Sequence, residues 1–168
     1  MRSLPELDRR LLLLARTRGH GRRRERAVAA YSMLGEHAAC WLALGLAGGA
    51  FDGGRRRRWL SGVGVVASSY ALNYAIKLTV CRRRPELAGL PPLTPTVSRL
   101  SFPSAHATTS FAAAGVYRGL LPAPALYGPA LAFALSRPYL GVHYPSDVLA
   151  GGLLGAALAG ATGRLSCR

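Results

Sequence analysis

The sequence Ser136-Arg-Pro-Tyr-Leu-Gly-Val-His143-Tyr-Pro-Ser-Asp147 places an arginine, a histidine and an aspartate among residues that are mostly apolar or small. Long hydrophobic segments lie on both sides of it. Charges at such a place cost several kcal/mol unless they have partners or water, so a cluster of them indicates a functional site. Pro145-Ser146 is typical of a helix start, where Asp147 could bind one ring nitrogen of His143 and leave the other free to react. The alternative is a helix cap beside an interfacial histidine.

Two upstream stretches contain residues of the same chemical types. Lys77-Leu-Thr-Val-Cys-Arg-Arg-Arg84-Pro85 ends one hydrophobic segment, and Ser101-Phe-Pro103-Ser104-Ala105-His106 begins another. In chain order the three stretches read K-x6-R-P, P-S-A-H and S-R-x5-H-x3-D. Each alone is compatible with the positive charge that flanks membrane segments. All three in this order, between apolar segments, form a specific pattern.

Arginine-rich anion binding is the chemistry that these residues favour. A phosphate group is a dense anion, and guanidinium groups match its geometry with paired hydrogen bonds. Ser104 is expected to cap a helix that begins with Ala105 and His106, and the free N–H groups of such a helix end attract anions.

The series of motifs resembles the type 2 phosphatidic acid phosphatase family, membrane lipid phosphatases that share a site with vanadium haloperoxidases. The resemblance covers about Lys77 to Asp147 and the flanking helices. The second motif of the family is most often P-S-G-H, whereas this chain has Ala105 at the third position. Only the backbone N–H is needed there, so alanine should serve, with less conformational freedom.

The resemblance also implies a role for each motif residue. His143 would attack phosphorus and form a phosphohistidine, and Asp147 would orient and stabilise it. His106 would protonate the leaving group and then activate water. No cofactor and no metal are expected, because the cations already neutralise the developing charge. The phosphate would be bound by Lys77, Arg84, Ser104, the backbone of Ala105, and Arg137.

Composition places these motifs in a membrane protein. The 168 residues suffice for one domain, half of them are hydrophobic, and the net charge of +15 is almost entirely due to arginine. The arginine clusters alternate with apolar blocks, which is the pattern of loops beside membrane spans and not of a nucleic-acid-binding surface. The spacing of the three cysteines, Cys40, Cys81 and Cys167, matches no metal or redox motif. Cys40 and Cys81 fall in or beside apolar segments and are interpreted as small apolar residues.

The predicted fold is an all-α, multi-pass bundle in the cell membrane, with about five transmembrane helices and an N-terminal interfacial helix. Residues 1–27 form the basic N-terminal segment, where leucines at helical spacing indicate an amphipathic helix; a partly disordered tail is the alternative. Residues 28–168 form the phosphatase domain, and 86–102 a proline-rich loop. The apolar blocks are about 31–51, 59–80, 104–121, 124–135 and 148–161.

Five spans place all three motifs and the N-terminus on one side of the membrane. Apart from the motif cations, that side carries twelve arginines and the other side seven, so the positive-inside bias predicts a site that faces the cytoplasm. Glu36, His37 and Arg99 lie outside the motifs. The first two are interpreted as interfacial or interhelical polar residues and the third as a possible headgroup contact.

The most consistent function is removal of a phosphate from a membrane lipid, with a polyprenyl phosphate, diphosphate or phosphorylated polyprenyl-sugar as the favoured substrate. Phosphatidic acid or a related glycerolipid phosphate is the next choice, followed by a non-catalytic protein that binds phospholipid. A metal site of His106, His143 and Asp147 has suitable ligand types. Three neighbouring Lys and Arg side chains would repel the metal ion, which disfavours it.

Overall fold

The computed structural model describes residues 4–165 of the chain. This range contains seven α-helices, joined by 3₁₀ turns and coil, and no β-strand. The expected all-helical fold is confirmed for this range. Cys167 and Arg168, which entered the sequence argument, lie outside it. The helices are α1 (Leu4–Thr17), α2 (Arg22–Leu34), α3 (Ala39–Phe51), α4 (Arg56–Val80), α5 (Ala105–Tyr117), α6 (Ala123–Tyr139) and α7 (Pro145–Leu165).

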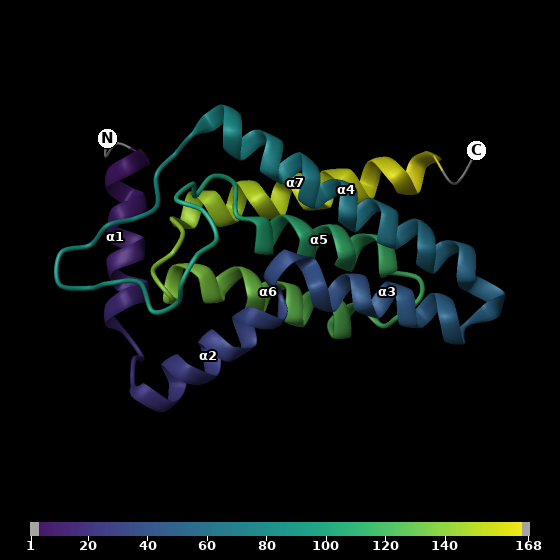
Figure 1. Ribbon diagram of the computed structural model, residues 1–168, viewed down its shortest axis with the longest axis horizontal. Helices are drawn as coiled ribbons and strands as arrows, with labels where there is room; N and C mark the ends of the chain where they lie inside the picture. Colours follow the sequence, from purple (N-terminus) through teal and green to yellow (C-terminus); the bar gives the residue numbers. More distant parts are fainter. Residues whose placement is uncertain (1–3, 166–168) are drawn as a thin grey trace.

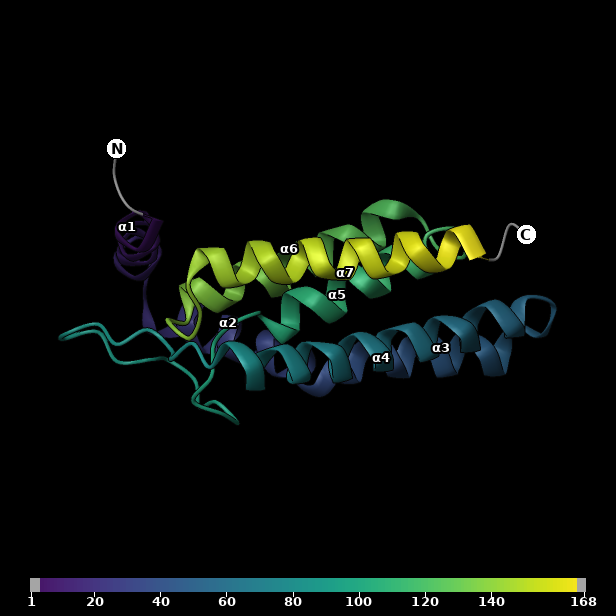
Figure 2. The ribbon, with the colours of Figure 1, turned by 90° about the horizontal axis from the view of Figure 1, so that it is seen from above.

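The helices α3 to α7 form a bundle in two layers, which Figure 2 shows from above: α3 and α4 lie on one side, and α5, α6 and α7 on the other. Helix α5 packs against α4, α6 and α7, and is buried along most of its length. Helix α1 lies across one end of the bundle, at a steep angle to the other helices (Figure 1). The coil between α4 and α5 lies at the same end.

Local sequence explains where α7 begins and where α4 ends. Helix α7 starts at Pro145, a residue suited to the first helical position, and the Asp147 carboxylate accepts a hydrogen bond of 2.9 Å from the Tyr144 backbone N–H. Helix α4 ends at Val80 and is capped by Cys81, whose φ of 53° is left-handed, and Pro85 follows. These boundaries place Lys77, Arg82 and Arg84 near the start of α7.

Small residues allow α5 and α7 to approach closely. A Cβ on Gly155 would lie 2.1 Å from the Thr108 carbonyl oxygen, and one on Gly151 would lie 2.6 Å from that of Ser104. Both distances are far below van der Waals contact, so a side chain at either position would push the helices apart. The glycine- and alanine-rich composition of this segment is thus used for close packing, as the sequence indicated.

The first apolar block differs from the single span that the sequence predicted. It is divided by a 3₁₀ turn over Glu36–Ala38, in which His37 and Ala38 have φ values of 51° and 61°. Helix α3 therefore has only 13 residues and is about 20 Å long, less than the roughly 30 Å of a bilayer core. Within the described residues, one segment, Gly53–Val80, is long and apolar enough by itself to cross a membrane.

The N-terminal segment contains the helix α1, which packs against α6 and α7. Asp8, Leu12 and Arg16 form its buried face, one helical turn apart from each other. The opposite surface carries exposed leucines: Leu4, Leu7, Leu11, Leu13 and Leu14. This arrangement fits an amphipathic helix whose polar face contacts the protein.

Candidate active site

The three motifs converge on one pocket at the end of the bundle that α1 covers. Six of the eight predicted site residues line it. Ser104 and Asp147 lie buried behind it, with 0 % of their surfaces exposed. The six that line it are Lys77, Arg84, Ala105, His106, Arg137 and His143.

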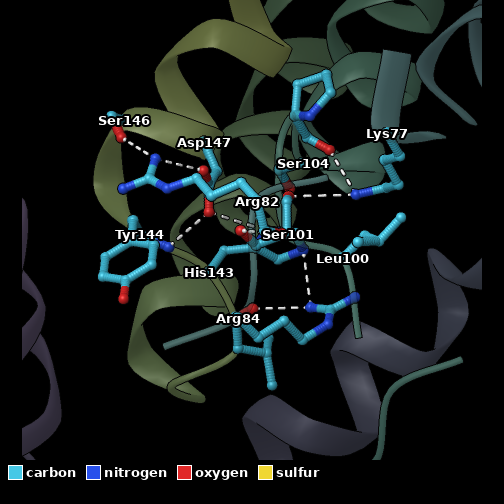
Figure 3. Close-up of polar contacts among 12 residues, drawn as sticks. Lys77, Arg82, Arg84, Leu100, Ser101, Ser104, His143, Tyr144, Ser146 and Asp147 are labelled. Carbon is cyan, nitrogen blue, oxygen red and sulfur yellow. Dashed lines mark hydrogen bonds and ion pairs between the residues drawn. The ribbon is translucent and has the colours of Figure 1, made fainter. Parts of the chain in front are cut away.

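Lys77 fixes the coil that carries the second motif. Its ammonium group donates hydrogen bonds to the carbonyl oxygens of Ser101, at 3.2 Å, and Pro103, at 2.7 Å (Figure 3). Ser104 occupies the N-cap position of α5, but its side chain does not make the cap bond that the sequence predicted. Its buried hydroxyl has no hydrogen-bond partner, so its donor is unused in this structure.

Arg84 and His143 are in direct contact in the pocket. The Arg84 Nη1 donates to the Val142 carbonyl oxygen at 2.7 Å and lies 3.1 Å from the His143 Nε2 (Figure 3). A guanidinium group can only donate, so Nε2 must be the acceptor and the ring proton lies on Nδ1. The lone pair of Nε2 thus faces the Arg84 guanidinium group.

Asp147 lies on the other side of the same ring. Its Oδ2 is 3.5 Å from the His143 Nδ1, an ion-pair distance longer than a hydrogen bond. The carboxylate is held by the Tyr144 backbone N–H and by Arg82, whose Nη1 donates to Oδ1 at 2.8 Å. Asp147 can therefore orient His143 as the motif implied, from a position fixed by two donors.

His106 and Arg137 share a partner from α2, the residue Ser32. The His106 Nε2 lies 2.9 Å from the Ser32 carbonyl oxygen, so it carries the proton and Nδ1 remains available to accept one. The Arg137 Nη1 donates to the Ser32 hydroxyl, while its buried Nε has no partner. An unpaired guanidinium N–H in a basic pocket is suited to an anionic ligand.

Positive charge dominates the electrostatics of the pocket. Burial first, and then the nearby Arg84, Arg137 and Lys77, hold the pKa of His143 well below its ordinary value. Burial also lowers the pKa of the Arg84 guanidinium, against the attraction of Asp147. His143 is therefore neutral at physiological pH and has a lone pair available for nucleophilic attack.

Arg82 and Asp8 take part in this site, although the sequence indicated only flanking charge for Arg82 and no role for Asp8. Arg82 binds Asp147 and, through Nη2, the Asp8 carboxylate at 2.8 Å. The only sequence signal for Asp8 was an acidic residue on the predicted amphipathic helix. Nothing in the sequence alone pairs α1 with a residue 74 positions away.

Three polar residues that belong to none of the motifs lie in two places: Glu36, His37 and Arg99. Glu36 and His37 lie on the pocket rim, where the His37 Nδ1 is 2.8 Å from the Tyr70 hydroxyl and Glu36 is 4.0 Å from the His106 Nε2. Arg99 lies in an adjoining groove along the coil between α4 and α5, which shares Arg84 and Thr96 with the pocket. In the part of the chain that the structure describes, no three His, Cys, Asp or Glu side chains are grouped so that they could hold a metal ion.

The fold is similar to those of two solved structures. Aquifex aeolicus LpxE superimposes with a TM-score of 0.81 at 21 % identity, over 94 % of this chain and 95 % of that one. A transmembrane PAP2-type phosphatidylglycerolphosphate phosphatase from Bacillus subtilis gives 0.79 at 24 % identity, over 99 % and 87 %. Each similarity extends over most of both chains, so the overall fold is one found in these proteins.

The class that the fold and the pocket define is confirmed by sequence comparison: residues 58–166 match the PAP2 superfamily, and the chain belongs to it. It is a phosphatase of that family, as the motifs predicted. Decaprenylphosphoryl-5-phosphoribose phosphatase of Mycolicibacterium smegmatis is 45 % identical over 124 residues, 73 % of this chain and 68 % of the relative. The protein of that name from Mycobacterium tuberculosis is 46 % identical over 131 residues, 76 % and 72 %.

Proposed function

We propose that this protein removes a terminal phosphate from a polyprenyl-linked phosphate lipid by way of a phosphohistidine. The observation that carries the proposal is His143, with Nε2 facing the pocket beside Arg84 and Nδ1 facing Asp147. The substrate class rests on the mycobacterial relatives, whose names specify a decaprenylphosphoryl sugar phosphate. The phosphate oxygens are bound by the side chains of Lys77, Arg84 and Arg137, by the Ser104 hydroxyl and by the Ala105 N–H.

The reaction has two displacements at phosphorus. In the first, the Nε2 lone pair of His143 forms a bond to phosphorus, and the bond to the leaving oxygen breaks. His106, after its Nδ1 has taken up a proton, supplies that proton to the departing alkoxide and returns to the neutral form. In the second, His106 removes a proton from water, whose oxygen displaces Nε2 and releases inorganic phosphate. Asp147 stabilises the charge on the His143 ring throughout, and the cations stabilise the phosphoryl oxygens.

The bundle α3–α7 is proposed to cross the membrane five times, with residues 28–168 as the phosphatase domain and residues 1–27 as an interfacial segment. Helix α2 runs through that division, at 27 and 28. The outer surface of the bundle supports the spans, because large apolar side chains are exposed on it, where lipid would cover them. They include Leu46, Leu72, Leu78, Leu131, Leu135, Leu149 and Leu153.

A phosphate-release panel with the purified protein in detergent tests the proposal. The substrates are a polyprenyl monophosphate, a polyprenyl diphosphate, a polyprenyl-linked sugar phosphate and phosphatidic acid, each with and without a chelator. We expect the highest kcat/KM on a polyprenyl-linked substrate. His143→Ala should abolish release, and His106→Ala should slow it by about 10²- to 10⁴-fold. Full activity of purified His143→Ala would contradict the mechanism, and preference for phosphatidic acid would contradict the substrate class.

A further inference from the structure

Helix α1 reaches the active site through one buried carboxylate. Asp8 is only 4 % exposed, and it accepts hydrogen bonds from the Arg82 Nη2 at 2.8 Å and from the Ser146 backbone N–H at 2.9 Å. The Ser146 hydroxyl binds the same carboxylate. Asp8 therefore joins α1 both to the coil after α4 and to the first turn of α7.

Arg82 links two carboxylates. Its Nη2 binds Asp8 and its Nη1 binds Asp147, each at 2.8 Å, and its guanidinium carbon lies 4.2 Å from the centre of the Tyr144 ring. Figure 3 shows Arg82 between the Asp147 carboxylate and Ser146. Because one cation serves two anions, the group of Asp8, Arg82 and Asp147 keeps one net negative charge behind His143.

That negative charge opposes a strongly positive environment. A single carboxylate paired with Arg82 alone would be neutralised and would contribute little to stabilising a positively charged His143 ring. The charged and titratable groups that face His143 come from several elements: Lys77 of α4, Arg84 of the coil, His106 of α5, Arg137 of α6, Asp147 of α7, and Glu36 on the rim. Among these, Asp147 is the only anion adjacent to the imidazole.

We propose that Asp8 is a positioning residue of the active site, which acts through Arg82 to hold Asp147 in place and to preserve its charge beside His143. Helix α1 is thereby part of the catalytic unit, although it lies outside the residues 58–166 that match the family. The inference rests on the proposed function, because it assumes that His143 is the nucleophile. Asp8 itself touches neither the pocket nor His143.

Asp8→Asn tests the charge with little change in shape, since the amide oxygen can still accept a bond from Ser146. We expect kcat to fall about tenfold with KM nearly unchanged, because the phosphate-binding cations are untouched. Glu6→Ala is the matched control, because it removes an exposed carboxylate of α1 whose ion-pair partner among residues 4–165 is Arg10. It should leave kcat within twofold of the original chain. Asp8→Glu, which keeps the charge, should recover most of the rate.

A second measurement separates an electrostatic role from simple loosening of α1. The ring of His143 can be titrated by NMR in chains with labelled histidine, with His143→Ala to assign the signal. Removal of a negative charge disfavours the imidazolium, so Asp8→Asn should move the midpoint to lower pH. Loosening would hydrate the ring and move the midpoint up, which would overturn the inference.

A double-mutant cycle tests whether Asp8 acts through Arg82. In an Arg82→Met background the cost of Asp8→Asn should shrink to that of Glu6→Ala, because the intermediary is gone. Independent, multiplicative losses would overturn the inference, as would Asp8→Asn kinetics equal to those of Glu6→Ala in the original chain. His143→Ala is run in parallel. If it retains activity, the proposed function fails and not merely the role of Asp8.

Discussion

At the scale of single residues, the two ring nitrogens of His143 meet opposite environments. Nε2 faces the Arg84 guanidinium at 3.1 Å, and Nδ1 faces the Asp147 carboxylate at 3.5 Å. A donor on one side and an anion on the other select the same tautomer, with the proton on Nδ1. The neutral ring is therefore oriented with its lone pair toward the phosphate-binding groups, before any substrate is bound.

The protonation of His143 gives a prediction that does not depend on the substrate. Burial and the surrounding cations lower its pKa, so the neutral form persists below the ordinary value of 6.5. We expect the NMR titration midpoint of His143 to lie below 6.5, and the ring to become cationic only as the pH falls through that lower midpoint. A midpoint at or above 6.5 would contradict the buried, cation-lined environment.

Replacement of the pocket arginines by lysine gives a second prediction at this scale. Arg84 donates to Ser98, Val142 and His143 at once, a geometry that requires a planar, branched donor. We expect Arg84→Lys and Arg137→Lys each to weaken phosphate binding, seen as a higher KM and a higher inhibition constant for vanadate. Arg83→Lys, on the exposed coil, is the control and should behave like the original chain. Full activity of both pocket variants would exclude a role for the paired guanidinium donors.

At the scale of helices, the contact between α5 and α7 positions both histidines, because His106 is on one helix and His143 directly precedes the other. Gly155→Ala should therefore destabilise the fold, since its Cβ would lie 2.1 Å from the Thr108 carbonyl oxygen. We expect a lower Tm in detergent and reduced activity. Gly160→Ala is the matched control on α7, where a Cβ meets nothing within 4 Å. Its Tm should not fall, because alanine favours helix.

Helix boundaries could be predicted from the sequence where local chemistry decides them. Pro145 and Asp147 indicated the start of α7, and Pro85 the end of the segment that carries Lys77. The turn at Glu36–Ala38 could not be predicted in this way, because Ala38 is a good helix former and its left-handed φ is imposed by tertiary packing. The local sequence feature at this turn is Gly35. In the structure a Cβ at that position would lie 2.9 Å from the rings of His106 and Phe133.

At the scale of the whole molecule, the side of the membrane on which the pocket opens is still a prediction. Pro92 lies exposed in the coil at the pocket end of the bundle. In a background that lacks the native cysteines, a Pro92→Cys variant should be protected from a membrane-impermeant thiol reagent in intact cells, since the arginine distribution favours a cytoplasmic site. It should react once the cells are permeabilised. Rapid labelling of intact cells would place the pocket on the outer face.

The set of residues at the site could be inferred from the sequence to a large extent, because three ordered motifs specify it and helical hairpins return them to one end. Its supporting contacts could not. Ser32, which binds both His106 and Arg137, and Asp8, which binds Arg82, belong to segments without a motif. Such long-range polar pairs depend on how the helices dock, and no local pattern of charge or hydrophobicity encodes that docking.

The contact of helix α1 with α7 also determines when, during synthesis, the complete site can assemble. Asp8 is synthesised 138 positions before its partner Ser146. A nascent chain that ends before α7 already has the cations of the pocket but lacks His143, Asp147 and the N–H group to which α1 docks. We therefore expect phosphatase activity only after α7 has been synthesised, when Asp8 and Ser146 can meet.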